Sequence, residues 1–384
     1  MVVFIYSVLI AIAFMFFPSP VFSETLKISF AHAMVGISLL LLLINVLVNC
    51  FAWGALQKAV KTSTAAILQL YENDKKMFFF LGLSFLFPLI SLSLSLPTLY
   101  FEIGELRFWY SIWIVFLGLV LTTTLYAIVK VSKYLNPYSV TKFFTDKRYK
   151  LDFTTRVDAL FEIAMKGIGA TNPSLVIESI DNLQNMLCET DWKDQNIKQQ
   201  LNYENLYTLN LLDLLHEKAL DRKLEPVCSK LITTLGKLTL KITQYDPQLG
   251  NYPAHFIGKF ALAACDAKLM SVAEKATCTL LEVGKSIFQL ENVNNLKLDE
   301  IYFSIIQSMD KIAKKVFQND KSINISLLIQ PFQDLKNLFE KGKGNSHPNK
   351  IFIVGELDRV INQFEQLQLV MRTIPPINLE NVES

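Results

Sequence analysis

The stretch AMVGISLLLLLINVLVNCFAWGAL, residues 33–56, is apolar along almost its whole length and contains no charged side chain. The hydrocarbon core of a bilayer is crossed by about 20 residues of helix. The stretch therefore predicts a membrane-spanning helix. The whole chain is 51% hydrophobic and only 19% charged, below the roughly 25% charged residues of ordinary soluble proteins.

Three further apolar stretches lie at residues 2–17, 77–100 and 107–129. Pro88 falls inside one of them, and membrane helices tolerate a proline when neighbouring groups satisfy the carbonyl that it frees. We therefore predict a four-span transmembrane module over residues 1–135. Residues 1–23 also fit a signal peptide cleaved after Ser23, but they lack a basic start, so we favour a retained span.

Basic residues are distributed unevenly over the connections between these spans. Lys27 is the only basic residue of the first connection and Arg107 the only one of the third. The second connection and the segment after the fourth span are rich in lysine. Because cytoplasmic loops have the excess of Lys and Arg, residues 57–76 and everything after residue 130 are predicted to be cytoplasmic. The basic residues concerned are Lys58, Lys61, Lys75, Lys76, Lys130, Lys133, Lys142, Lys147, Arg148 and Lys150.

Ser38, Asn45 and Asn49 form a polar stripe within the 33–56 stretch, because residues four and seven apart share one side of a helix. A carboxamide in lipid costs free energy unless it is hydrogen-bonded. Serines at residues 84–95 and threonines at residues 122–124 offer partners on other spans. The stripe predicts helix–helix contact or a neutral pore lining. Span centres without ionisable residues argue against a proton- or sodium-coupled transporter.

The chain from residue 136 onward is more polar and shows amphipathic helical periodicity, most clearly at residues 224–242. Clusters of Gly, Pro and Asn separate the helical segments. No repeat of fixed period is visible. We predict an all-α cytosolic domain over residues 136–372, built as a helical bundle or an irregular solenoid. A flexible tail is expected at residues 373–384.

Enzymatic motifs are absent from the sequence, so we expect no enzyme. The five cysteines have no CxxC spacing and the four histidines form no HExxH motif, so no metal site and no cofactor are expected. No GxSxG or P-loop occurs. His216 follows Asp213 by three residues, a pair more typical of a surface contact than of a catalytic dyad. The net charge of +2 does not favour nucleic-acid binding.

One segment of the polar module is a candidate anion-binding turn, formed by Gly167, Gly169 and Asn172 ahead of a helix that begins at Pro173. Free amides at a helix start bind anions. The alternative is a plain turn in which Asn172 caps the helix, and this is the more common role of such a sequence.

The same region is similar to a known motif. IAMKGI (163–168), GATNP (169–173) and IDNL (180–183) follow one another as in the bacterial "predicted membrane protein" group known as domain-of-unknown-function family 2254. Members of that family have four spans, a basic cytosolic connection and a helical C-terminal region. This chain is two residues shorter there, lacks the first proline and has Asn172 in place of an aspartate. The resemblance implies a bacterial inner-membrane protein and no particular activity.

Two functions are compatible with these observations. The first is a homo-oligomeric channel-like assembly for ions or small solutes, with a polar path along Ser38, Asn45 and Asn49 and a regulatory cytosolic domain. The second is a membrane-anchored scaffold or sensor, whose helical domain binds a cytosolic partner protein. In both cases the lipid bilayer surrounds the N-terminal module.

Overall fold

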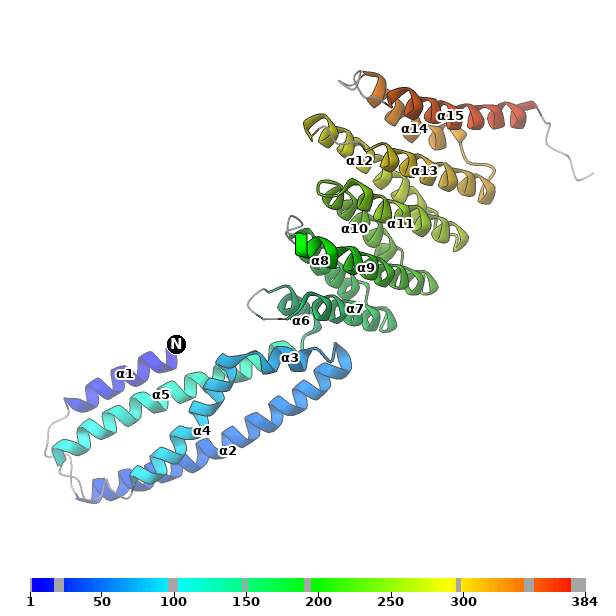
Figure 1. Cartoon of the computed structure of the whole chain (residues 1–384). Coiled ribbons are helices and arrows are strands. Elements are labelled where there is room, and N and C mark those ends of the chain that lie inside the picture. The colour runs from blue at the N-terminus through cyan, green and yellow to red at the C-terminus, as the bar shows by residue number, and fades with distance from the viewer. Residues whose placement is uncertain are drawn as a thin grey trace, which may run out of the picture. The chain divides into compact units, whose positions relative to one another are not determined.

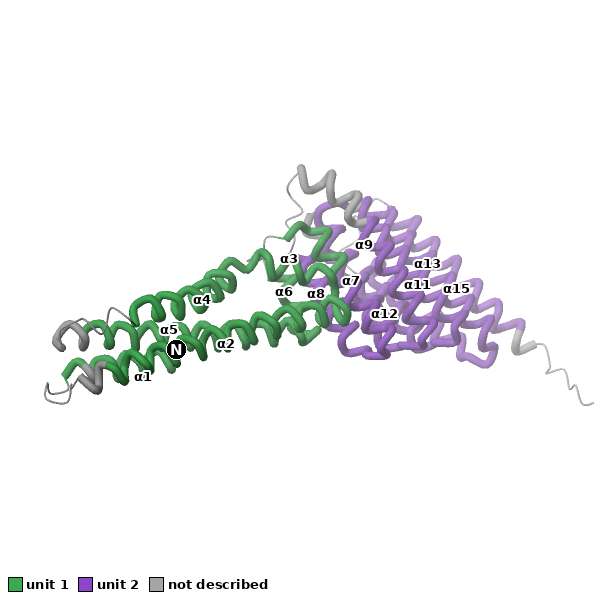
Figure 2. The backbone as a smooth tube through the Cα atoms, turned by 90° about the horizontal axis from the view of Figure 1, so that it is seen from below, with its two compact units in different colours: residues 1–159 green, residues 160–384 purple. Residues whose placement is uncertain are grey.

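The computed structural model describes residues 2–16, 24–95, 103–146, 149, 151–189, 195–294, 298–341 and 349–373. The regular secondary structure of these residues is entirely helical, which confirms the predicted all-α class. The chain divides into two compact units, residues 1–159 and residues 160–384 (Figure 2). The division falls within helix α7, beyond the boundary that the sequence predicts at residue 135.

Unit 1 contains four apolar helices and several short ones (Figure 1). The helices are α1 (Val2–Met15), α2 (Glu24–Thr62), α3 (Ile67–Glu72), α4 (Lys75–Ser95), α5 (Ile103–Tyr134) and α6 (Pro137–Thr145), and unit 1 also includes the start of α7 (Phe153–Gly169).

Three of these helices are long and apolar enough to cross a membrane, over residues 28–62, 75–95 and 108–134. They coincide with three of the predicted spans, although residues 96–100 of the third predicted span lie outside the described part. The apolar helix predicted at residues 2–17 is shorter than a span. Its 14 residues extend about 21 Å, against a hydrocarbon core of about 30 Å. Residues 17–23, with the candidate cleavage region, lie outside the described residues.

Helix α1 nevertheless packs closely along α5. The contact depends on small side chains: a Cβ atom added to Gly118 would lie 1.9 Å from the Ser7 Oγ. The Ser111 hydroxyl donates a hydrogen bond to the Ala11 carbonyl at 3.2 Å. Small residues permit such close backbone approach between helices in lipid, where no hydrophobic force holds them together.

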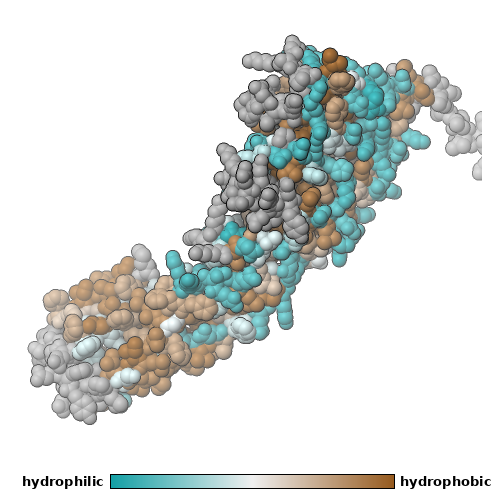
Figure 3. Space-filling model, viewed as in Figure 1, coloured by the Kyte–Doolittle hydropathy of each residue, from teal (hydrophilic) through white to brown (hydrophobic). Residues whose placement is uncertain are grey.

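Helix α2 buries one side chain at every third or fourth position. The buried positions alternate in a regular 3–4 pattern, which is the spacing of a coiled-coil seam. They are Ala31, Met34, Ser38, Leu41, Asn45, Val48, Ala52, Ala55 and Ala59, and Leu56 beside Ala55 is buried as well. Between them, large apolar side chains such as Leu40, Leu47 and Phe51 are exposed. Figure 3 shows this apolar surface over unit 1, as expected for helices in contact with lipid.

Unit 2 is an open stack of antiparallel helix pairs (Figure 1). It contains the rest of α7, then α8 (Pro173–Glu189), α9 (Gln195–Asp221), α10 (Glu225–Thr243), α11 (Pro247–Asp266), α12 (Met270–Asn294), α13 (Asp299–Asn319), α14 (Ile325–Lys341) and α15 (Lys350–Thr373). Helices α8, α10, α12 and α14 contact one another in turn, and so do α9, α11, α13 and α15. The two series form two layers with a common apolar core.

The core of unit 2 follows the predicted helical stripes. In α10, Val227, Leu231 and Leu235 are fully buried, in agreement with the periodicity of residues 224–242. Successive helices within a layer approach closely where residues are small, since a Cβ atom at Gly258 of α11 would lie 2.7 Å from the Ser308 Oγ of α13. The predicted tail at residues 373–384 lies outside the described residues, apart from Thr373, the last residue of α15.

Polar contacts between successive pairs repeat along the stack. The bonds Lys259–Asp213, Ser271–Glu225, Asn251–Glu300, Lys285–Asp334, Thr234–Gln184 and Asn319–Cys265 join residues 46 to 54 positions apart. The structural repeat therefore varies in length from one helix pair to the next, and this variation explains why the sequence shows no fixed period. Each pair contacts mainly its neighbours, as in other solenoids.

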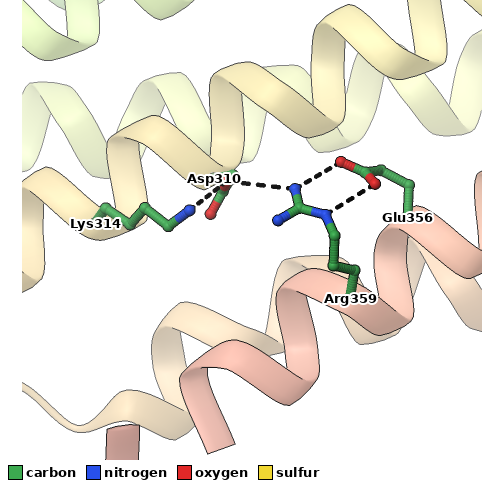
Figure 4. A network of polar contacts seen from close by, with 4 residues as sticks. All are labelled: Asp310, Lys314, Glu356 and Arg359. Atoms are coloured by element: carbon green, nitrogen blue, oxygen red, sulfur yellow. Dashed lines mark hydrogen bonds and ion pairs between the residues drawn. The ribbon is translucent and has the colours of Figure 1, made fainter. Parts of the chain in front are cut away.

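The last of these contacts is a four-residue network between α13 and α15 (Figure 4). Arg359 holds both carboxylate oxygens of Glu356, at 2.6 and 2.9 Å. The Asp310 carboxylate accepts from Lys314 at 2.7 Å and lies 3.8 Å from the Arg359 guanidinium. Asp310 is largely buried whereas its partners are half-exposed, so solvent weakens the ion pairs, and the network orients α15 more than it stabilises it.

Candidate functional site: the polar seam and the basic pocket of unit 1

Asn45 compensates for the proline of the neighbouring helix. Pro88 in α4 has no N–H, so the carbonyl four residues earlier, that of Ser84, has no partner within the helix. The Asn45 side chain in α2 donates its Nδ2 hydrogen to this carbonyl. Asn45 is 2% exposed, and its other amide atom, Oδ1, has no hydrogen-bond partner among the described residues.

Ser38 meets two other helices at a second polar junction. Its hydroxyl donates to the Ser91 Oγ of α4 at 2.7 Å, and the Trp113 Nε1–H of α5 donates to the same oxygen at 2.7 Å. Ser38 and Ser91 are buried, and Trp113 is partly buried. Ser91 thus connects α2, α4 and α5 in one place.

Asn49 does not share this environment. It is exposed, and its amide donates back to the Asn45 carbonyl of the same helix at 2.8 Å. A step of four residues advances about 400° around a helix, so Asn49 lies some 40° off the line of Asn45. The predicted stripe is therefore divided: Ser38 and Asn45 lie in the seam, and Asn49 lies beside it.

The predicted anion-binding turn packs two helices closely together and caps the second of them. Gly167 and Gly169 belong to helix α7, and a Cβ atom at Gly167 would lie 2.8 Å from Val176 of α8. Asn172 caps α8 through a bond from the Leu175 N–H to its Oδ1 at 3.2 Å. The capping role is thus present, while anion binding at this turn stays a prediction.

A basic pocket that we did not predict lies at the lysine-rich end of unit 1. It has a volume of about 480 Å³, within the roughly 300–1,000 Å³ of small-molecule sites. Its lining combines basic and aromatic side chains from the start of α4, the end of α5, α6 and the following segment. The lining residues are Asn73, Asp74, Lys75, Lys76, Tyr126, Val129, Lys130, Lys133, Phe143 and Tyr149.

A buried carboxylate organises one wall of the pocket. The Asp74 side chain is 5% exposed and forms an ion pair with Lys130. Its oxygens also accept from the Tyr134 hydroxyl at 3.5 Å and from the Met77 N–H at 3.3 Å, so Asp74 both anchors α5 and caps α4. A buried charge is tolerated only when it is paired in this way.

Lys130 is further held between two tyrosine rings, with its ammonium 5.8 Å from the ring centre of Tyr126 and 5.9 Å from that of Tyr149. Burial raises the pKa of Tyr149, against the opposing effect of Lys130, so its hydroxyl stays neutral and can donate a hydrogen bond. Lys75, Lys76 and Lys133 are exposed, and no described residue forms an ion pair with them. The pocket therefore has a positive potential with aromatic walls.

The pocket was not evident in the sequence because its residues belong to three separate segments, around 73–76, 126–133 and 143–149. The lysines were visible, and the sequence argument used them only to orient the spans. The signal that could have identified the site is Asp74, the one acidic residue directly before a basic span start. Among the described residues, no three His, Cys, Asp or Glu side chains lie together as a metal site.

The chain matches no protein family, no curated protein and no solved structure with which it was compared. The resemblance to family 2254 therefore stays a prediction from the motif at residues 163–183.

Proposed function

We propose that the protein is a membrane-anchored scaffold, in which unit 1 lies in a bilayer and the helical stack of unit 2 binds a partner protein in the cytoplasm. The lysine-rich end of unit 1 is then cytoplasmic by the positive-inside rule. We also propose a bacterial inner membrane, on the motif resemblance, and retention of α1 as a short fourth membrane segment, on its close contact with α5.

The observation that carries this proposal is the open stack of unit 2. Stacked helix pairs leave two long faces uncovered, and proteins of this architecture use such faces to bind other proteins. Ion pairs at Lys259, Lys285 and Lys315 join successive helices within each layer of the stack and help to fix its geometry, as a binding surface requires.

The polar groups within unit 1 support an anchoring role for the spans. Asn45 satisfies the carbonyl freed by Pro88, and Ser38 and Trp113 satisfy Ser91. These groups act in contacts between helices, so the membrane part has a structural use for them that needs no transported solute.

The test combines reconstitution with affinity purification of the full chain. In liposomes we expect no ion or solute flux above that of protein-free liposomes. From native membranes we expect a partner at fixed stoichiometry, recovered reciprocally when the partner has the tag. Flux that rises with the amount of protein would contradict the scaffold function.

One observation favours a channel as the second candidate: Asn49 is polar yet exposed on the apolar surface of α2. In a homo-oligomer this side chain could face another copy or a central path. If so, Asn49→Leu abolishes flux in liposomes or reduces the oligomer to monomers in mild detergent, whereas the buried Asn45 is not the residue to test. A monomeric wild-type protein would exclude this candidate.

A further inference from the structure

We propose that the basic pocket of unit 1 binds the phosphate group of an anionic ligand, with Lys75, Lys76 and Lys133 as the binding cations. This site is independent of the partner that unit 2 binds. The pocket is a built cavity, because buried Asp74 fixes its rear wall and aromatic side chains form its sides.

The charge distribution selects an anion. Four lysines and one aspartate line the cavity, and the aspartate is already neutralised by Lys130. The three remaining ammonium groups have no ion-pair partner among the described residues, although they lie on one cavity. Like charges gathered in this way repel one another, and a bound anion relieves that repulsion.

The ligand chemistry is that of a phosphate. Ammonium groups bind phosphate as point charges, and a neutral tyrosine hydroxyl such as that of Tyr149 donates a further hydrogen bond. Basic pockets at the cytoplasmic ends of spans are sites for lipid phosphates. The cavity wall also includes Val129 and Tyr126, both substantially exposed next to the apolar surface of α5. A ligand with an apolar part would therefore continue along the helix, but a free phosphate ester would fit the cations equally well.

The experiment compares these two sources with the full-length protein in nanodiscs of neutral phosphatidylcholine. One arm titrates phosphatidylglycerol into the nanodiscs, and the other adds inorganic phosphate. Binding is measured by native mass spectrometry and by the shift in melting temperature. The site variant is the double substitution Lys75→Gln and Lys76→Gln. The matched control is Lys58→Gln and Lys61→Gln, which removes the same charge from exposed residues at the end of α2 that do not line the cavity.

A lysine that contacts the bound phosphate directly is expected to contribute about a fivefold increase in affinity, so the site variant is expected to bind roughly 25-fold more weakly. The control variant is expected to keep the wild-type affinity. Preference for phosphatidylglycerol identifies a lipid headgroup, and preference for inorganic phosphate identifies a soluble ester; either result supports the site. Unchanged affinity of the site variant, equal weakening in both variants, or no binding of either probe overturns the proposal.

Discussion

At the scale of single residues, the polar side chains inside the apolar spans have identifiable structural tasks. The proline at residue 88 frees a carbonyl, and the asparagine at residue 45 satisfies it. Each residue depends on the other, because transferring an unpaired carbonyl or carboxamide from water into lipid costs free energy on the order of several kcal/mol.

We expect Asn45 and Pro88 to be energetically coupled. Asn45→Leu should destabilise the protein by about 1 kcal/mol, because it removes the hydrogen bond to the Ser84 carbonyl. That is the net value of such an interhelical bond in lipid, which is smaller than the cost of transferring the unpaired group from water. With Pro88→Ala as background, the backbone bond to Ser84 returns and the same substitution should cost much less. A double-mutant cycle from denaturant unfolding in mild detergent measures this coupling. Asn49→Leu is the control, with little expected effect, and equal costs in both backgrounds would refute the assignment.

His216 is a second residue whose environment differs from expectation. It is neither a surface contact nor part of a dyad with Asp213, because Asp213 pairs with Lys259 at 2.5 Å. The imidazole is 2% exposed and stacks on Phe260 with ring centres 3.9 Å apart. Burial lowers the pKa of His216 to about 4, with Lys259 acting in the same direction and Asp213 opposing it.

This low pKa predicts acid sensitivity. The ordinary pKa of about 6.5 applies to the unfolded chain, so the unfolded state takes up a proton first as the pH falls. The contribution of neutral His216 is fully present above pH 6.5 and is lost as the pH falls toward about 4. The loss is on the order of 3 kcal/mol.

Melting temperatures of the full chain between pH 7 and pH 4 measure the effect. His216→Phe and His216→Leu should both flatten the pH dependence in this window. His255→Gln, at an exposed position, should leave the wild-type profile unchanged. The assignment fails if the His216 variants keep the wild-type slope.

At the scale of elements, three connections between helices have the same type of turn. Thr171, Lys223 and Lys268 have positive φ angles of 50°, 53° and 62°. After each of them, the next N–H bonds a carbonyl five residues earlier, from Asn172 to Gly167, Leu224 to Ala219 and Leu269 to Ala264. These are Schellman turns, which usually have glycine at the left-handed position. Without glycine there, sequence patterns do not reveal that the three connections are alike.

Glycine at such a position should therefore stabilise the protein. Lys268→Gly removes the side chain from a residue whose backbone is left-handed and thereby relieves its strain. We expect a gain of about 0.5–1 kcal/mol in the free energy of unfolding. Lys275→Gly, at an exposed site within α12, should instead cost about 1 kcal/mol. Thermal unfolding compares the two variants. A loss of stability in both would show that the strain is not relieved.

At the scale of the whole molecule, the two units differ in what keeps them folded. Unit 2 buries apolar stripes in water, so the hydrophobic effect stabilises its stack. In unit 1 the exposed surface is itself apolar, so close contacts such as Gly118 with Ser7 and hydrogen bonds such as Ser38 with Ser91 specify the packing. This difference predicts which solvent each unit occupies.

The orientation can be tested with the native cysteines. Cys278 is exposed in unit 2, whereas Cys228 and Cys265 are buried, and burial raises their pKa values to about 12 and 11. With Cys188 replaced by Ser, a membrane-impermeant maleimide should label Cys278 in inside-out vesicles and not in intact spheroplasts. Cys278→Ser should remove the label. Labelling of intact spheroplasts would place unit 2 outside the cytoplasm.

The sequence by itself determined the all-α class, the positions of three spans and the stripes that build the core of unit 2, because each depends on local periodicity and length. It placed Ser38, Asn45 and Asn49 on one stripe, and only the packing of α2 against α4 separated Asn49 from the other two. Tertiary structure alone decided the Asp74–Lys130 pair, the basic pocket and the structural repeat of variable length. They join residues tens of positions apart, and a linear pattern contains no information on which of these distant groups share one space.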